Sequence, residues 1–345
     1  MPVTPEPIMK IALGYMAAKF LFAANEIGLF EALAEGPASL EELSKHTSVP
    51  LRTTGIVAAA MVGLGLIEQE GERYRNGEAA ATFLTGKPSI DLRPMLRYQD
   101  VISYPMWTKF GEVVRAGGRE PQFGKLDEIQ QQIFSAGVEA FTAPVATTLG
   151  ATYDFSHHQR LLDIGGGTGS FLLAVLRKYP GLRGTLFELP GACAVARQRL
   201  SQEPEKARIE IVEGDVFKAP LPQDHDVLLI ANTVHVLSAA HNLELLGKAR
   251  ATAQVGARLL LVDLWTDATH SQPLAAALMS GQFLIMAGEG QTYSEQEADE
   301  WLKQTGWRKL ERKQLAGAAG LIVAEACGAK VKMIACSGRP GRCHD

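Results

Sequence analysis

Residues 161–169, Leu-Leu-Asp-Ile-Gly-Gly-Gly-Thr-Gly, constrain the fold of this chain more than any other segment. A short apolar run passes through one acid into closely spaced glycines, and a helical pattern follows. This order is typical of a β-strand, a tight turn and a helix that together bind a nucleotide. The segment therefore predicts a nucleotide-binding α/β domain, with an ordinary strand-to-helix turn as the alternative.

The acid in this segment, Asp163, discriminates between nucleotides. A carboxylate just before the turn repels the pyrophosphate that a helix N-terminus otherwise attracts, and it favours a cationic ligand. S-adenosylmethionine (SAM) fits, because it carries an ammonium and a sulfonium and has no phosphate. The glycines Gly165, Gly167 and Gly169 also depart from a dinucleotide fingerprint, which needs glycine or alanine where this chain has Ser170. We therefore expect SAM, released as S-adenosylhomocysteine, rather than NAD.

From residue 160 onward, apolar strand-like runs alternate with helical patterns. The runs cover residues 161–164, 184–187, 209–212, 226–231, 257–263 and 320–325. This alternation predicts an α/β fold with a doubly wound, Rossmann-like parallel sheet. Ligands bind such a sheet outside the carboxyl ends of its strands. Polar residues at the ends of the runs are therefore candidate ligand contacts.

Such residues follow successive runs. Glu188 can accept hydrogen bonds from ribose hydroxyls, although a dehydrogenase also places an acid there. Asp215 can bind an adenine amino group while the apolar residues after it cover the adenine face. Each acid alone can equally be a solvated loop carboxylate. The predicted donor-binding residues are Asp163, Gly165, Gly167, Glu188, Leu189, Asp215, Val216, Phe217 and Asn232.

His235 is the candidate general base. It stands four residues beyond the apolar run 227–231, where the mouth of the sheet is expected. Imidazole is the side chain whose unperturbed pKa lies nearest neutrality. Methyl transfer needs in-line alignment and one group that accepts the proton of the acceptor. A structural histidine that caps the next helix is the alternative.

Large apolar residues could line an acceptor pocket. Met279, Phe283 and Met286 recur on one helical face, and Trp107 and Phe141 lie in an aromatic-rich stretch between residues 95 and 150. Core packing is the default for all five. The functional alternative is an apolar wall that faces His235 and suits an aromatic or polyketide-like acceptor.

The first hundred residues have a winged-helix order. A capping box at Ser39 and Glu42 opens one helix, a second spans about residues 51–63, and a hairpin covers 66–75. A DNA-reading helix should present basic and amide side chains, whereas residues 56–62 read Ile-Val-Ala-Ala-Ala-Met-Val. The net charge of -4 also argues against nucleic acid. We interpret the module as a dimerisation and substrate-lid domain.

Composition bounds the remaining possibilities. With 345 residues, 46% hydrophobic and 21% charged, the chain has the profile of a soluble protein of two domains. Residues 1–7 are proline-rich and lysines interrupt the apolar residues after them, so we expect no signal peptide, a cytoplasmic location and no membrane partner. Four cysteines make no disulfide framework. Cys336, Cys343 and His344 form at most a weak metal pattern, and we expect no metal.

Residues 154–325, and more loosely the N-terminal module, resemble the small-molecule O-methyltransferases of the caffeic acid and hydroxyindole type, including bacterial natural-product members. The matching elements are the glycine segment, Phe187-Glu188-Leu189-Pro190, Gly214-Asp215-Val216-Phe217, the position of His235, and Leu260-Leu261-Val262-Asp263. We therefore expect a class I methyltransferase domain at residues 101–328, an N-terminal all-helical winged-helix dimerisation domain at 1–100, and a flexible tail at 329–345. The resemblance also implies a homodimer that swaps N-terminal helices, a small-molecule acceptor, and His235 as base with Asp263 beside it.

This chain departs from the family around the base. His235 is followed by Val236 and Leu237 instead of aspartate and tryptophan, and Asp263 stands where the family has glutamate. A second family glutamate is replaced near Tyr293, with Glu289 out of register. A base that lacks an acidic orienter should be less basic or differently held.

Two reactions other than O-methylation are therefore compatible with the sequence. One alternative is methylation of carbon in an α-keto acid, because the segment 265–283 resembles relatives with that activity. Arg93 and Arg97, one helical turn apart, could then bind the substrate carboxylate. Another is a family member that binds SAM for a different reaction.

Overall fold

The computed structural model describes residues 3–87, 90–122 and 125–328. Chain contacts divide the protein into two compact units, Met1–Val145 and Ala146–Asp345. The helices that follow the N-terminal module, up to Val145, belong to the first unit. The predicted tail at 329–345, with Cys336, Cys343 and His344, lies outside the described residues.

The N-terminal unit begins as a helical module with a small antiparallel sheet. Its helices are α1 (Glu6–Ala12), α2 (Gly14–Glu26), α3 (Leu29–Ala32), α4 (Leu40–Thr47), α5 (Leu51–Gly63) and α6 (Glu78–Phe83), and its strands pair in the order β1 (Ala38–Ser39), β3 (Arg73–Asn76) and β2 (Ile67–Glu70). Ser39 caps α4, because its hydroxyl accepts a hydrogen bond from the Glu42 amide at 3.3 Å and its own amide donates to the Glu42 carboxylate at 2.7 Å. The predicted helices, capping box and hairpin are confirmed, although the three strands mean that the module is not all-helical.

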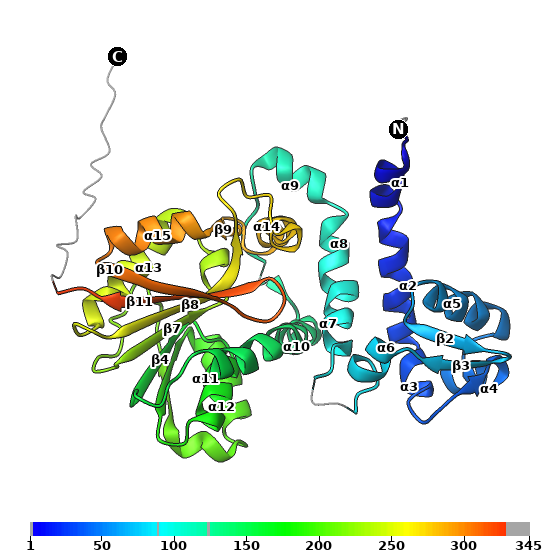
Figure 1. The fold of residues 1–345 in the computed structure, drawn as a ribbon, viewed down its shortest axis with the longest axis horizontal. Helices are drawn as coiled ribbons and strands as arrows, with labels where there is room; N and C mark the ends of the chain where they lie inside the picture. Colours follow the sequence, from blue (N-terminus) through cyan, green and yellow to red (C-terminus); the bar gives the residue numbers. More distant parts are fainter. Residues whose placement is uncertain (1–2, 88–89, 123–124, 329–345) are drawn as a thin grey trace. The chain divides into compact units, whose positions relative to one another are not determined.

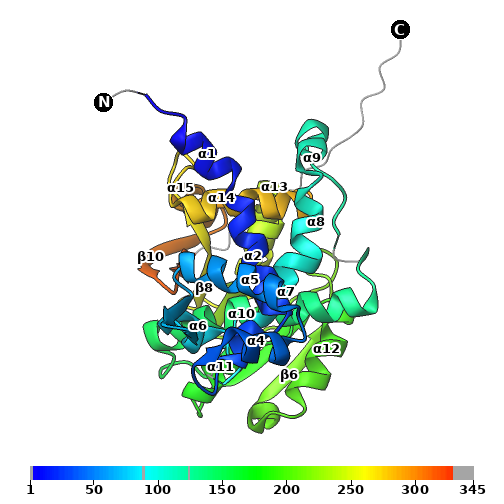
Figure 2. The same cartoon turned by 90° about the vertical axis from the view of Figure 1, so that its right-hand side faces the viewer.

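Helix α5 stands where a winged-helix protein would place its DNA-reading helix. Thr54, Ala58 and Met61 on one side are buried in the core of the module, while Ile56 on the other side is 45% exposed. Figure 2, in which this unit faces the viewer, shows α5 beside α2. Arg52 is the only basic residue of the helix. The exposed side of α5 is therefore apolar, which does not suit a phosphate backbone.

The rest of the first unit is helical. It contains α7 (Arg93–Tyr98), a π-helical turn (Gln99–Ser103), α8 (Tyr104–Trp107), α9 (Phe110–Ala116) and the long α10 (Glu128–Thr152), which continues into the second unit. The Arg93 guanidinium forms ion pairs with Asp91 at 2.8 Å and Glu31 at 2.6 Å. These carboxylates raise the pKa of Arg93 above its ordinary value, against a smaller effect of burial.

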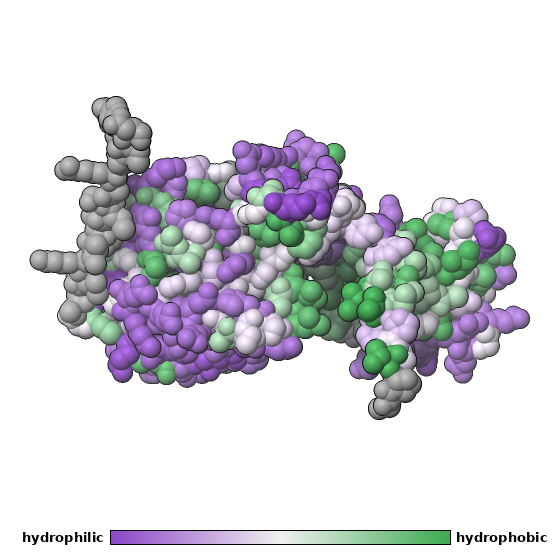
Figure 3. Space-filling model, turned by 90° about the horizontal axis from the view of Figure 1, so that it is seen from above, coloured by the Kyte–Doolittle hydropathy of each residue, from purple (hydrophilic) through white to green (hydrophobic). Residues whose placement is uncertain are grey.

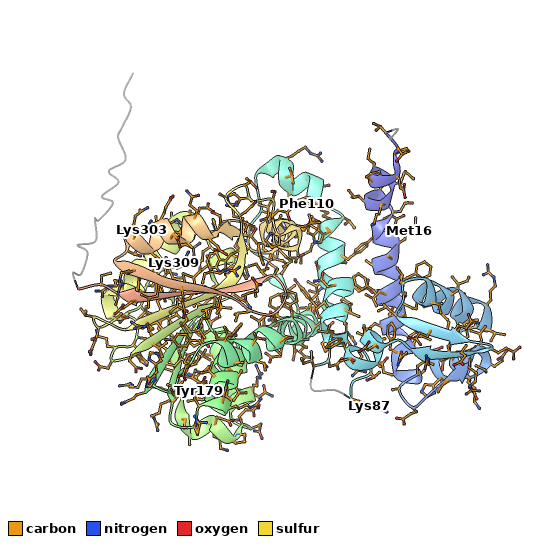
Figure 4. The ribbon with its side chains drawn as sticks, in the orientation of Figure 1. Met16, Lys87, Phe110, Tyr179, Lys303 and Lys309 are labelled. Carbon is orange, nitrogen blue, oxygen red and sulfur yellow. The ribbon has the colours of Figure 1, made fainter. Side chains whose placement is uncertain are left out.

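Apolar side chains are exposed along α1 and α2. Ile8, Ile11 and Tyr15 are 71%, 82% and 50% exposed, and Met16, labelled in Figure 4, is 44% exposed. Figure 3 shows apolar surface gathered over this N-terminal unit. In the part of the chain described, the helical stretch Glu6–Glu26 is long and apolar enough to cross a membrane, with a mean hydropathy of 1.3. One such helix near the N-terminus is weak evidence for a membrane span. Apolar side chains exposed on successive helical turns are typical of a surface that associates with another molecule.

The second unit is built on one large sheet, drawn in Figure 1. Its strand order is β10 (Trp307–Gln314), β11 (Ala319–Ala326), β8 (Arg258–Thr266), β7 (Val227–Ala231), β4 (Arg160–Ile164), β5 (Arg183–Glu188) and β6 (Ile209–Glu213), with the short β9 (Tyr293–Ser294) beside β8. The five strands β4 to β8 are parallel, as the sequence predicts. The expectation of a wholly parallel sheet is wrong for the last two long strands, because β11 runs antiparallel to β8 and β10 antiparallel to β11.

Helices cover both faces of this sheet. Figure 1 shows α11 (Ser170–Lys178) and α12 (Pro190–Leu200) on one face, and α13 (Ala239–Thr252) and α15 (Glu295–Gln304) on the other. The helix α14 (Leu274–Met286) follows β8. The end of α10 is tied to this unit by Tyr179, labelled in Figure 4, whose hydroxyl donates to the carbonyl oxygens of Gly150 and Tyr153 at 3.0 Å each.

Candidate active site

The glycine turn after β4 needs glycine for two different reasons. Gly165, Gly167 and Gly169 have φ of +70°, +57° and +83°, where other residues are strained. Gly166 instead allows a close approach, since a Cβ there would lie 2.3 Å from a carboxylate oxygen of Asp163. Sequence analysis assigned no role to Gly166, because spacing alone does not reveal which side chain folds back over a turn.

Asp163 lies directly beneath this turn. Its side chain is fully buried, and neither carboxylate oxygen has a hydrogen-bond partner of normal geometry. Burial, helped by the nearby Glu188 carboxylate, raises the pKa of Asp163 from its ordinary 3.8 to about 7. A buried acid without a partner requires a physical explanation.

Backbone hydrogen bonds join the ends of three neighbouring strands around Asp163. The Gly165 amide donates to the Phe187 carbonyl, and the Gly214 amide donates to the Glu188 carbonyl, both at 2.9 Å. The Glu188 carboxylate accepts a hydrogen bond from the Leu189 amide. Burial raises the pKa of Glu188, and the amides of Leu189 and Gly167 oppose that rise. The first two predicted acids, Asp163 and Glu188, therefore lie close together at the carboxyl ends of β4 and β5.

The third acid, Asp215, is held in a loop after β6. Its carboxylate accepts from the Phe217 amide and pairs with Lys218, both at 2.9 Å. The Lys218 ammonium and the Phe217 amide lower the pKa of Asp215. Lys248 donates to the carbonyl oxygens of Val216 and Phe217 at 2.9 and 2.6 Å, which fixes the same loop from α13.

The end of β7 lies beside the glycine turn. Asn232 has φ of +53°, a left-handed conformation that asparagine tolerates, and its amide donates to the Val262 carbonyl of β8 at 2.8 Å. A Cβ on Gly165 would lie 3.0 Å from the Thr233 hydroxyl. Asn232 is thus close in space to the segment that contains Asp163, although 69 positions separate them in the sequence.

His235, which is partly buried, pairs with the buried Asp263. Its Nδ1 lies 2.6 Å from one Asp263 carboxylate oxygen, and its backbone amide donates to the other at 3.3 Å. Asp263 is only 1% exposed and also accepts from the Leu264 amide at 2.7 Å. When Nδ1 donates to Asp263, Nε2 keeps a free lone pair. Sequence analysis left the orienting group open; the structure places Asp263 in contact with the ring.

Glu289 does not take part in this pair. Its carboxylate lies 2.7 Å from Nδ1 of His241, and the His241 ring lies 4.9 Å from the ring of Phe217. Glu289 therefore contacts the loop that contains Phe217 through His241, and His235 has one carboxylate rather than two.

Three residues, Asn242, Tyr293 and Gly290, contact the turn that contains His235 (Val234–Val236). Asn242 donates to the Val234 carbonyl at 2.9 Å, and the Tyr293 hydroxyl donates to the Leu237 carbonyl at 2.7 Å. Gly290 packs so tightly that a Cβ would lie 2.1 Å from the His235 carbonyl oxygen. The local sequence around Asn242 and Gly290 does not indicate what they touch, and Tyr293 stands out only as the position near which a family glutamate is replaced.

The predicted acceptor-lining residues fall in both units. Phe283 stacks on the His235 imidazole, with ring centroids 3.7 Å apart and planes 16° apart. On the same helix Met286 is 3% exposed and Met279 is partly buried. In the first unit Trp107 packs against Phe110 at 4.7 Å, and Phe141 is 46% exposed. Among these five residues, Phe283 is thus placed directly against the predicted base.

One of the two arginines considered for carbon methylation already has acidic partners. Arg93 is already paired with Asp91 and Glu31, so it is not free to bind a substrate carboxylate. Within residues 3–87, 90–122 and 125–328, no group of three or more histidine, cysteine or acidic side chains is placed to hold a metal ion.

The open α/β sheet, with a buried acid beneath the glycine turn that follows β4, is compatible with the methyltransferase class. Family models agree in both units: an O-methyltransferase domain matches residues 110–308, and an O-methyltransferase dimerisation domain matches residues 9–86. The chain belongs to the O-methyltransferase family and is a SAM-dependent methyltransferase.

Individual relatives match nearly the whole chain. The 3-hydroxy-5-methyl-1-naphthoate 3-O-methyltransferase of Streptomyces sahachiroi is 32% identical over 92% of this chain and 94% of its own length. The tetracenomycin polyketide synthesis 8-O-methyl transferase TcmO of Streptomyces glaucescens is 25% identical over 92% and 96%. Human N-acetylserotonin methyltransferase, solved with SAM, superposes with a TM-score of 0.83 and 25% identity over 93% and 97%. The chain is thus an O-methyltransferase of the hydroxyindole and natural-product type.

Proposed function

We propose that this enzyme methylates a hydroxyl group of a small aromatic or polyketide-like acceptor, with His235 as the general base. The observation that carries this proposal is the 2.6 Å contact between His235 and the buried Asp263, close to the carboxyl ends of β7 and β8. A naphthoate enzyme and a polyketide enzyme among the relatives support the acceptor class.

The residues at the strand ends fit SAM. Both carboxylate oxygens of Asp163 are buried and lack a hydrogen-bond partner, which is unfavourable in free energy. A cationic ligand over the glycine turn would supply the missing partner. We assign Asp163, Gly165, Gly167 and Asn232 to the amino acid and sulfonium end of SAM. Glu188 and Leu189 would contact the ribose, and Asp215, Val216 and Phe217 the adenine.

When bound, SAM supplies an electrophilic methyl group, so the protein needs only to align the acceptor and remove one proton. Nε2 of His235 would accept the hydroxyl proton while the acceptor oxygen bonds to the methyl carbon and the bond from that carbon to sulfur breaks, which releases S-adenosylhomocysteine. Asp263 holds the Nδ1 proton, keeps the imidazole in the tautomer with a free Nε2, and stabilises the imidazolium that forms. The apolar surface of α14 would exclude water from the reacting atoms.

The acceptor class can be tested with labelled SAM and a panel of phenols, hydroxyindoles, hydroxynaphthoates and α-keto acids. We expect methyl transfer to aromatic hydroxyls, at a rate that a chelator does not change. Labelled product from an α-keto acid alone would contradict the proposal.

We further propose that two copies associate through α1 and α2, since the dimerisation-domain match covers them and their apolar side chains are exposed. Ile11→Glu is expected to weaken self-association about 100-fold or more, because a carboxylate would be buried in an apolar contact. Sedimentation of the wild type should give a mass near twice 37.2 kDa. Lys10→Gln on the same helix is the matched control and should remain dimeric, whereas an Ile11→Glu dimer of wild-type affinity would refute this interface.

A cytoplasmic location is part of the same proposal, because the relatives are biosynthetic enzymes that act on small molecules. Nucleic acid and membrane partners are not proposed.

A further inference from the structure

The imidazole of His235 is restrained on two different sides. Asp263 contacts its Nδ1 edge at 2.6 Å, and Phe283 covers one of its faces at 3.7 Å between centroids. The His235 side chain is 12% exposed, and Phe283 is 8% exposed. Neither contact involves Nε2 or the opposite face of the ring.

The two contacts restrain different motions of the imidazole ring. A single hydrogen bond fixes the position of Nδ1 but allows the ring to swing about that contact. The χ2 torsion of histidine is broad and has no sharp staggered minima, so the side chain itself does not set the plane of the ring. A flat partner stacked at 16° removes this freedom. The lone pair of Nε2 then points in one direction, as proton transfer at a defined distance requires.

The position of Phe283 is itself determined by the segment that holds the turn of His235. Thr292 of this segment is bonded to α14 by both its side chain and its backbone. The hydroxyls of Thr292 and Ser280 share a hydrogen bond, and the Thr292 amide donates to the Ser280 hydroxyl at 3.1 Å. The Thr292 hydroxyl also donates to the Ala276 carbonyl at 3.1 Å. The adjacent Tyr293 donates to the carbonyl of Leu237, directly after that turn. The segment Gly290–Tyr293 therefore contacts both the helix that carries Phe283 and the turn that carries His235.

We propose that Phe283 is a positioning residue that fixes the plane of the His235 imidazole, so that the acceptor hydroxyl reaches Nε2 edge-on. This inference depends on the proposed role of His235 as base. It gives Phe283 a function distinct from that of an apolar wall, since the ring face that would contact an acceptor is already occupied by the imidazole.

The test compares Phe283→Leu with Phe283→Tyr. Leucine keeps apolar bulk and loses the flat face, whereas tyrosine keeps the face. We expect Phe283→Leu to lower kcat about 10- to 100-fold with the acceptor KM and the SAM Kd within about twofold, and Phe283→Tyr to retain kcat within about threefold. Met279→Ala on the same helix should instead raise the acceptor KM. Thermal melting and SAM binding verify that each variant is folded.

A second measurement covers the case in which Phe283→Leu does not fold. Thr292→Val removes the hydroxyl that contacts Ser280 and the Ala276 carbonyl of α14 without opening a large cavity, and it should lower kcat with KM unchanged. In either folded variant, a raised KM at constant kcat would make Phe283 a wall residue and overturn the inference. If His235→Ala keeps full turnover, the proposed base is wrong; if that variant is inactive while Phe283→Leu is fully active, only the positioning role is wrong.

Discussion

His235→Ala is expected to lower turnover by about two to four orders of magnitude, because the acceptor hydroxyl would lose the group that takes its proton. The affinity for SAM should stay nearly unchanged, since no predicted donor contact involves the His235 side chain. The two quantities separate a base from a structural histidine, whose loss would impair folding and donor binding together. Initial rates with saturating SAM and calorimetric titration of SAM measure them.

Two further variants sharpen this test. Asp263→Asn keeps the shape of the orienting side chain but removes its charge, and we expect a loss of similar order to that of His235→Ala. His157→Ala, at an exposed position in the same unit, is the matched control and should retain wild-type turnover. Undiminished turnover in His235→Ala would exclude the assigned base.

Asp163→Asn is expected to weaken SAM binding about 10- to 100-fold, because a charge-assisted contact in a buried site contributes about 1.5–3 kcal/mol. The thermal shift that SAM produces in the wild type should largely disappear in this variant. Ser170→Ala is a suitable control, because Ser170 lies on the same turn and bonds Arg199, but we assign it no SAM contact. A full SAM-induced shift in Asp163→Asn would contradict the role of this acid.

The raised pKa of Asp163, about 7 without ligand, makes both SAM binding and stability depend on pH. A cationic ligand favours the ionised carboxyl, so SAM affinity should rise up to about tenfold per pH unit as the pH increases from 5.5 towards 7. Stability of the ligand-free protein should change in the opposite sense. The folded pKa exceeds the ordinary 3.8, so the folded state binds the proton more tightly, and stability falls as the pH rises from about 4 through 7.

The size of this stability change is bounded by the pKa shift, at about 4 kcal/mol for a rise of roughly three units. Asp163→Asn has no such titration, so without SAM it should melt above the wild type at pH 8 and close to it at pH 5. Thermal melting at both pH values measures the difference. An equal melting temperature at pH 8 would mean that the Asp163 carboxyl is not buried as a charged group.

Several features follow from local sequence patterns. Ser39 and Glu42 form the predicted capping box, because the interaction is completed within one helical turn. The apolar run before Asp163 and the glycines after it predict β4 and the turn, because strand burial and positive φ leave residue-specific signals. The same reasoning did not find β10, whose sequence Trp-Arg-Lys-Leu-Glu-Arg-Lys-Gln is mostly charged, because an edge strand has one solvated face and no apolar run.

By itself, the sequence determined which chemistry is available: an acid beside a glycine turn, acids or amides at successive strand ends, and one histidine beyond β7. Only the tertiary structure decided that Asp263 contacts His235, that Glu289 contacts His241 instead, and that Phe283 covers the imidazole. The reason is physical. The parallel pairing of β7 with β8 brings together residues 28 positions apart, and that register depends on how whole strands and helices bury their apolar faces.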